Sequence, residues 1–140
     1  MKKVIALYGT ANTGKSSTIK FVYDLLRNKY PNAKSNEIIM HADIKVFITV
    51  NNKKIGIESQ GDPISRLGDS LKYFVSIGCN VIICATRTRG RTVDAVNELK
   101  GKFEIKWIKQ DYISDISKQN SYNTTKAKAI IREAEMVINE

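Results

Sequence analysis

The sequence predicts an α/β fold of three layers, in which a mainly parallel sheet of about five strands lies between helices on both faces. Three observations support this fold class. Short apolar runs alternate with stretches of helical periodicity along most of the 140 residues, as in chains built from strand–helix–strand units. A glycine-rich segment joins the first strand to the first helix. Residues 43–58 instead have the pattern of one antiparallel hairpin.

The first strand and the first helix have strong local signals. Residues 4–8 form a continuous apolar run followed by glycine, as expected for a central strand buried on both faces. A helix is predicted over residues 15–29, and Pro31 prevents its continuation. Its apolar face consists of Ile19, Val22, Leu25 and Leu26.

The predicted hairpin has two strands, over residues 45–50 and 54–58. Between them stands Asn51-Asn52, a pair that favours a tight turn. Residues 37–40 have the pattern of a further strand before the hairpin.

A second helix is predicted after the hairpin. Asp62 as N-cap and Pro63 at the first helical position are expected to open it. Gly78 is expected to close it in the left-handed conformation. Its apolar face is predicted to contain Ile64, Leu67, Leu71, Phe74 and Val75.

The C-terminal part continues the alternation. Residues 81–85 form a second strong buried strand, followed by a polar segment and by a helix that Gly101 ends. Residues 103–109 are predicted to form one more strand, and a last helix, the closing helix, is expected from about residue 123. The apolar positions of the closing helix are Ala127, Ile130, Ile131, Ala134, Val137 and Ile138.

The glycine-rich segment carries the strongest functional signal in the chain. It fits the pattern G-x-x-x-x-G-K-[ST] and reads Gly9-Thr10-Ala11-Asn12-Thr13-Gly14-Lys15-Ser16. Glycines at both ends allow the backbone to curl, so that successive N–H groups and the helix N-terminus face an anion. Lys15 can reach the outer phosphates of a nucleotide, and the Ser16 hydroxyl is a suitable ligand for Mg²⁺. Ser17 is a further candidate contact.

With this motif between a predicted strand and a predicted helix, the chain resembles the P-loop NTPase superfamily. The resemblance implies a three-layer αβα P-loop NTPase fold, with residues 1–140 forming a single domain. It also implies that the chain binds Mg²⁺ and a nucleoside triphosphate.

The same resemblance implies a second acid at the end of a strand neighbouring the first one. Glu58 is the best candidate, as a catalytic and metal-binding carboxylate, and a solvent-facing Glu58 is the alternative. Residues 58–62 also resemble the acid-x-x-Gly segment of switch-type NTPases, in which Gly61 would contact the γ-phosphate and Asp62 would orient water. Glu58 and Asp62 depart from the usual Asp and Gln of that segment. Asp62 also has its alternative role as N-cap.

The base preference is predicted from a missing pattern. The guanine-specifying sequence Asn-Lys-x-Asp does not follow the last strand, where Lys109-Gln110-Asp111 stands instead. ATP is therefore expected in preference to GTP.

Three arginines, Arg87, Arg89 and Arg91, follow the second buried strand with no acid among them. Three roles compete for this segment: a phosphate-binding lid or arginine finger, a contact with a nucleic-acid backbone, and a solvated loop. The first is favoured because the segment leaves the same sheet edge as the glycine-rich segment. Arg87 is then the catalytic candidate, with Arg89 and Arg91 as phosphate contacts.

Four weaker signals remain. A carboxylate at Asp43 could position an acceptor hydroxyl in a kinase, although a turn role is favoured, and His41 is expected to be structural. Trp107 is expected to pack in the core or an interface. No Cys/His cluster is spaced for zinc.

Composition restricts the setting and the partners. Lys and Arg number 23 against 14 Asp and Glu, so the net charge of +9 favours anionic partners such as nucleotides or nucleic acid. Cys79 and Cys84 lie in or beside an apolar run and are expected to be reduced and buried. With no apolar run of membrane-spanning length, a cytoplasmic protein with no membrane partner is expected.

Three functions follow from these observations. Hydrolysis of a magnesium-bound nucleoside triphosphate, ATP in the first place, is preferred because no acceptor-binding insert is apparent. A small kinase that transfers the γ-phosphate to a nucleotide or another small acceptor is the second hypothesis. A nucleotide-regulated module that binds nucleic acid or a protein partner is the third.

Overall fold

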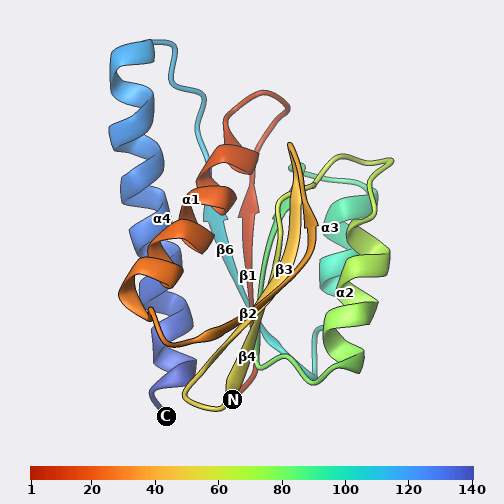
Figure 1. The fold of residues 1–140 in the computed structure, drawn as a ribbon. Helices are drawn as coiled ribbons and strands as arrows, with labels where there is room; N and C mark the ends of the chain where they lie inside the picture. The colour runs from red at the N-terminus through yellow and green to blue at the C-terminus, as the bar shows by residue number, and fades with distance from the viewer.

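The computed structural model describes residues 1–140 as six strands and four helices. In chain order these are β1 (Lys3–Tyr8), α1 (Lys15–Lys29), β2 (Lys34–Met40), β3 (Ile44–Val50), β4 (Lys53–Glu58), α2 (Leu67–Ser76), β5 (Val81–Thr86), α3 (Arg91–Asn97), β6 (Glu104–Lys109) and α4 (Ile116–Ile138). Figure 1 shows one sheet with α1 and α4 on one face and α2 and α3 on the other. The α/β class is therefore confirmed.

The six strands form one mixed sheet in the order β2-β3-β4-β5-β1-β6. The four strands from β4 to β6 in this order run parallel, and the predicted hairpin is present as the antiparallel pair β3 and β4. The sheet has one strand more than expected, because β2 pairs with β3 along most of its length. The strand predicted over residues 37–40 is thus the second half of a longer strand, β2.

The central strands are buried from both sides. In β1, Ile5 and Leu7 belong to the hydrophobic cluster beneath α1 and α4, whereas Val4 and Ala6 belong to the cluster beneath α2 and α3. All residues of β5 are buried as well. Helices on both faces leave no solvent side for these strands, which explains their continuous apolar sequence.

The turn predictions are confirmed by the backbone. Asn51 and Asn52 have φ values of 53° and 63° between β3 and β4, as two consecutive left-handed residues of a hairpin turn require. Gly78 has a φ of 81° after α2. Its amide donates to the carbonyl of Val75, and the amide of Cys79 donates to that of Phe74, so the residue closes the helix as expected.

The predicted start of α2 is wrong. The helix begins at Leu67, and Asp62 caps no helix; its carbonyl instead accepts from the amide of Ser65 in a turn that contains Pro63. Ile64 is 97% exposed and does not belong to the apolar face. The fixed φ of proline suits the second position of a turn as well as the first turn of a helix, so the local signal supported both structures.

The last helix begins earlier than expected. Asp115 caps α4 by accepting from the amide of Ser117. The added residues are mostly polar, and Ile116 is 81% exposed, so this part of the helix has no apolar face to reveal it. Figure 1 shows it projecting past the end of the sheet. No helix in the structure is both long enough and apolar enough to cross a membrane.

A substitution at Gly56 tests the packing of α2 on the sheet. A Cβ at this position of β4 would lie 2.5 Å from the ring of Phe74, which cannot withdraw because it is fully buried. We expect Gly56→Ala to lower the free energy of unfolding by about 1–3 kcal/mol through overpacking, measured by urea denaturation. Gly68→Ala is the control, because nothing lies within 4 Å of that site; an equal loss in both variants would contradict the packing argument.

Candidate functional site

The glycine-rich loop, residues 9–16, joins β1 to α1 at the carboxyl edge of the sheet. The amide of Gly9 donates to the carbonyl of Thr86 at 3.2 Å, and a Cβ on Gly9 would lie 2.6 Å from the carbonyl oxygen of Gln110. Asn12 and Gly14 have φ values of 62° and 90°. Only a residue without a side chain fits the first position, and the positive φ values give the loop its tight curl.

Lys15 is buried and turned into this loop. Its ammonium donates to the carbonyls of Gly9 at 2.6 Å and Thr10 at 2.8 Å. The pKa of Lys15 is lowered from 10.5 to about 8, mainly by burial and also by the positive charge of Arg87, whereas the carboxylate of Asp62 opposes the shift. The ammonium is thus a poorly solvated cation at the base of the loop, held by neutral acceptors.

Asp43 lies directly beside the loop. Its Oδ1 accepts from the hydroxyl of Ser16 at 2.8 Å and from that of Ser59 at 2.9 Å. Ser59 is nearly fully buried, and its hydroxyl accepts from the amide of Ile44 at 2.8 Å. The first residue of β3 and the residue after β4 therefore fix the carboxylate next to the N-terminus of α1.

An opening of about 340 Å³ separates the loop from the ends of the other strands. One wall is formed by residues 11–17 and the other by Ala42, Asp43, Ala85 and residues 59–62. The opening therefore brings together most of the predicted loop residues with Gly61 and Asp62. Thr10 is exposed at the loop tip, where its carbonyl also accepts from the hydroxyl of Thr13.

The expected position of Glu58 needs correction. β5 lies between β4 and β1, so β4 does not neighbour the first strand. Glu58 is fully buried on the α2 side of the sheet, where Arg66 binds it at 2.7 and 3.1 Å and the hydroxyl of Ser70 donates at 2.6 Å. The backbone amide of Gln60 donates a further bond. With its acceptor positions filled and its side chain outside the opening, Glu58 anchors the segment that follows β4 and is not placed to hold a metal.

Arg87 and Asp62 form an ion pair at the rim of the opening. Nη2 of Arg87 lies 3.0 Å from Oδ1 of Asp62, whose side chain is 72% exposed. The Nε atom of Arg87 is buried without a hydrogen-bond partner. Gly61 is wedged against β5, because a Cβ there would lie 2.3 Å from the carbonyl oxygen of Ala85. Because Asp62 is exposed, the ion pair is weak in solvent and is broken easily.

The remaining predicted residues lie outside the opening. Arg89 and Arg91 are exposed and form no salt bridge, and His41 is exposed in the turn before β3. Trp107 packs edge-on against Tyr8, with ring centroids 6.1 Å apart, so the prediction of a packing role is confirmed.

Both cysteines are buried and free. Burial raises the pKa of each thiol, Cys79 and Cys84, to about 12. They therefore behave as small apolar residues rather than as nucleophiles. No group of three or more His, Cys, Asp or Glu side chains is placed to hold a metal ion.

Sequence analysis missed the role of Gln110, which follows β6 and is almost fully buried. Its amide nitrogen donates to the carbonyl of Thr13 at 3.0 Å and to Asn123 Oδ1 at 2.9 Å, and its oxygen accepts from the hydroxyl of Thr18 at 3.2 Å. Gln110 thus ties the glycine-rich loop to α4. The available signal for Gln110 was its place as a polar residue directly after a predicted strand. For the contact of Asp43 with Ser16, the available signal was a carboxylate just before β3.

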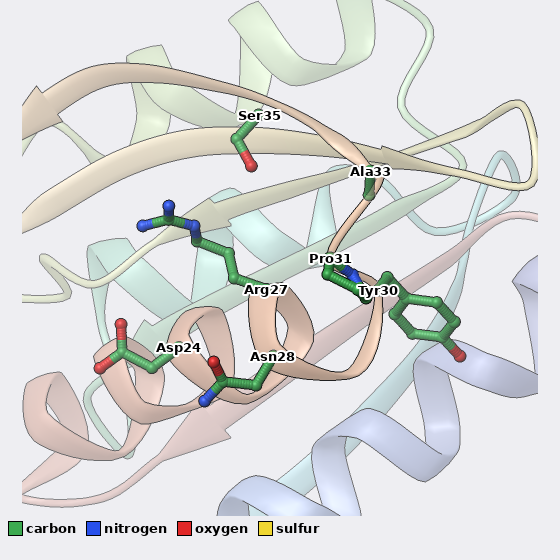
Figure 2. A pocket seen from close by; sticks show the side chains of 7 residues that line it. All are labelled: Asp24, Arg27, Asn28, Tyr30, Pro31, Ala33 and Ser35. Atoms are coloured by element: carbon green, nitrogen blue, oxygen red, sulfur yellow. The ribbon is translucent and has the colours of Figure 1, made fainter.

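A larger cavity of about 750 Å³ lies elsewhere, between the last turns of α1 and the start of β2 (Figure 2). It is lined by Asp24, Arg27, Asn28, Tyr30, Pro31, Ala33 and Ser35. Figure 2 shows the Tyr30 ring directed toward α4 and away from the other polar groups. The cavity contains no loop of backbone donors and no hydroxyl–carboxylate pair like that of Ser16 and Asp43, so the smaller opening is the candidate functional site.

The residues around the opening could hold an anion beside a hard cation. Backbone amides, the N-terminus of α1 and a buried ammonium favour a polyanion. Oxygen ligands such as the Ser16 hydroxyl and the Asp43 carboxylate suit Mg²⁺. No protein-family model, curated protein or solved structure matches the chain.

Truncation of Arg66 tests the structural role of Glu58. Because Arg66→Ala leaves a fully buried carboxylate without its charge partner, we expect it to lower the free energy of unfolding by about 3–5 kcal/mol, measured by urea denaturation. Adding Glu58→Gln removes the unpaired charge, so the double variant should be more stable than Arg66→Ala alone. If the double variant loses as much free energy of unfolding as the two single variants added together, the two residues act independently and the argument is contradicted.

Proposed function

We propose that the opening binds a nucleoside triphosphate with Mg²⁺, ATP in preference to GTP, and hydrolyses its γ-phosphate. The observation that carries this proposal is the hydrogen bond from Ser16 to Asp43, at 2.8 Å. It joins the last residue of the G-x-x-x-x-G-K-[ST] sequence to a carboxylate from a distant part of the chain. The sequence expected to bind phosphates and a carboxylate suited to Mg²⁺ line one opening, which supports the proposal.

The loop is suited to a chain of phosphates. Residues 11–17 line the opening at the N-terminus of α1, where backbone amides without helical partners favour an anion. Lys15 would exchange the carbonyls of Gly9 and Thr10 for phosphate oxygens, which bind its charge more strongly. The negative charge of the phosphates would thus compensate the ammonium of Lys15 for the water that it loses on burial.

Magnesium would be held between the two oxygen ligands. The Ser16 hydroxyl is the candidate direct ligand, and Asp43 would bind the ion directly or through a water molecule. Bound there, Mg²⁺ would offset the negative charge of the two outer phosphates. Asp43 therefore takes the role expected of Glu58.

Residues of the opposite wall would assist the attack of water on the γ-phosphorus, with the β–γ bridging oxygen leaving on the nucleoside diphosphate. The amide of Gly61 is the candidate contact for a γ-phosphate oxygen. Arg87 would exchange Asp62 for the transferring phosphoryl group, where a guanidinium stabilises developing charge. Asp62, once released, would accept a hydrogen bond from the attacking water.

The preference for ATP is supported by Gln110. This residue stands in the position where a guanine-specific sequence would follow β6, but its amide is engaged by Thr13, Thr18 and Asn123. The asparagine of the guanine-specifying sequence is also missing, because Ile108 stands in its place before Lys109 and Asp111.

The first experiment measures phosphate release from Mg-ATP and Mg-GTP by the purified protein. We expect slow release that is faster with ATP, and loss of both binding and release in Lys15→Ala, because the phosphates lose their buried cation. Lys118→Ala is the matched control, since that lysine is 77% exposed on α4. Equal nucleotide affinity in wild type and Lys15→Ala would contradict the site. Binding without release, with ADP formed only on addition of an acceptor, would instead identify a kinase.

Asp43→Asn separates the metal role from phosphate binding. The amide can still accept from Ser16 and Ser59, so the fold should persist, but it carries no charge for Mg²⁺. We expect turnover to fall by about 10- to 100-fold, with partial recovery at high Mg²⁺. Asp69→Asn, on exposed α2 surface, is the control; full activity of Asp43→Asn would remove Asp43 from the mechanism.

The lowered pKa of Lys15 predicts a pH dependence. Phosphate favours the charged ammonium. The affinity for Mg-ATP should therefore be highest below pH 8 and fall by up to about tenfold per pH unit above it. Isothermal titration calorimetry across this range provides the measurement. Lys15→Arg keeps its charge, so its affinity should not change over the same range; a wild-type affinity independent of pH would contradict the assignment.

A further inference from the structure

One part of the sheet carries basic and aromatic side chains and no covering helix. On the α2 side, α2 packs on β4 and β5, and β2 and β3 extend beyond it. The residues of β3 that face α1 and α4 are buried, whereas Lys45, Phe47 and Thr49 on the opposite side are partly exposed. We name this surface the β2–β3 face and define it by Lys34, Asn36, Lys45, Phe47, Lys54 and Tyr73.

The strand register places these side chains together. Phe47 pairs with Asn36 of β2 on one side and with Gly56 of β4 on the other. Thr49 pairs in the same way with Lys34 and Lys54. Directly opposed residues of antiparallel strands project from the same face, so Phe47 has a lysine diagonally placed on each neighbouring strand.

Cations and rings are in direct contact on this face. The ammonium of Lys45 lies 4.8 Å from the centroid of the Tyr73 ring, and that of Lys54 lies 5.8 Å from the centroid of the Phe47 ring. None of the three lysines of this face forms a salt bridge. The nearest carboxylate on the same side, Glu58, is neutralised by Arg66, and the exposed Asp69 stands one helical turn before Tyr73 without pairing to Lys45. Lys54 also donates to the carbonyl of Ile77 at 2.9 Å, but no carboxylate neutralises the positive charge of this face.

We infer that the β2–β3 face binds single-stranded nucleic acid. The bases of a single strand are free to stack on Phe47 and Tyr73, whereas the bases of a duplex are already paired and stacked. The lysines can contact the phosphates that link these bases. Asn36, exposed between the lysines, can form hydrogen bonds with a base edge. The net charge of +9 supports an anionic polymer as the occupant. This inference does not depend on the proposed nucleotide site, because the two share no residue.

The test is fluorescence anisotropy with labelled oligo(dT) and oligo(rU) of about 20 nucleotides, at salt concentrations from about 50 to 200 mM. Wild type should bind single strands more tightly than a duplex of equal length. Lys45→Gln combined with Lys54→Gln should weaken binding and reduce the slope of log affinity against log salt by about 1.4, as expected for two lost contacts. Phe47→Leu keeps an apolar side chain for packing but removes the stacking ring, and should cost about tenfold in affinity.

The matched control is Lys118→Gln with Lys128→Gln, which removes the same charge from α4 on the other side of the sheet. Weakening by the control equal to that of the Lys45 and Lys54 pair would overturn the inference, as would no binding of either oligonucleotide. Equal affinity for polyglutamate, unchanged in Phe47→Leu, would instead identify an acidic polypeptide as the partner. Loss of binding in Lys15→Ala alone would place the oligonucleotide in the nucleotide opening, which also overturns the inference but leaves the proposed function intact.

Discussion

The parallel register of β1 with its two neighbours is the constraint on which the candidate site depends. Tyr8, the last residue of β1, lies opposite Thr86 of β5 and Lys109 of β6. The chain therefore leaves three strands at one level, at Gly9, Arg87 and Gln110. The backbone of the glycine-rich loop is hydrogen-bonded to both sides, through Gly9 to Thr86 and through Thr13 to Gln110. A shift in register would therefore separate the loop from β5 and from its support on α4.

Sequence could predict what is encoded locally. The glycine-rich loop, the buried strands, the Asn51-Asn52 turn and α1 each depend on a few consecutive residues, and all four elements are present. The insertion of β5 between β4 and β1 depends on which strands pair, and hydrophobic periodicity is the same for either order. In β4, the alternation of side chains predicts that Glu58 lies on the other face of the strand from Ile55 and Ile57. Only the assembled sheet shows that this side faces α2 and that Asp43 is the carboxylate beside the loop.

Positive charge is handled in two different ways on the same sheet. At the candidate site, one buried ammonium is held by backbone carbonyls and has a pKa lowered by its surroundings. On the β2–β3 face, partly exposed lysines rest on aromatic rings and remain in contact with solvent. The first arrangement suits a small ligand that replaces the carbonyls and excludes water, whereas the second suits a flexible polymer whose counterions are released on binding.

The ion pair between Glu58 and Arg66 closes the segment between β4 and α2 at its base. Both partners belong to the packed body of the protein, whereas Ile64 at the outer end of this segment is 97% exposed. A protease would therefore find an accessible site there. Cleavage at that point would leave β4 and α2 joined through Glu58, Arg66 and Ser70, so the two fragments would remain one folded particle, and the cut would become visible only after denaturation.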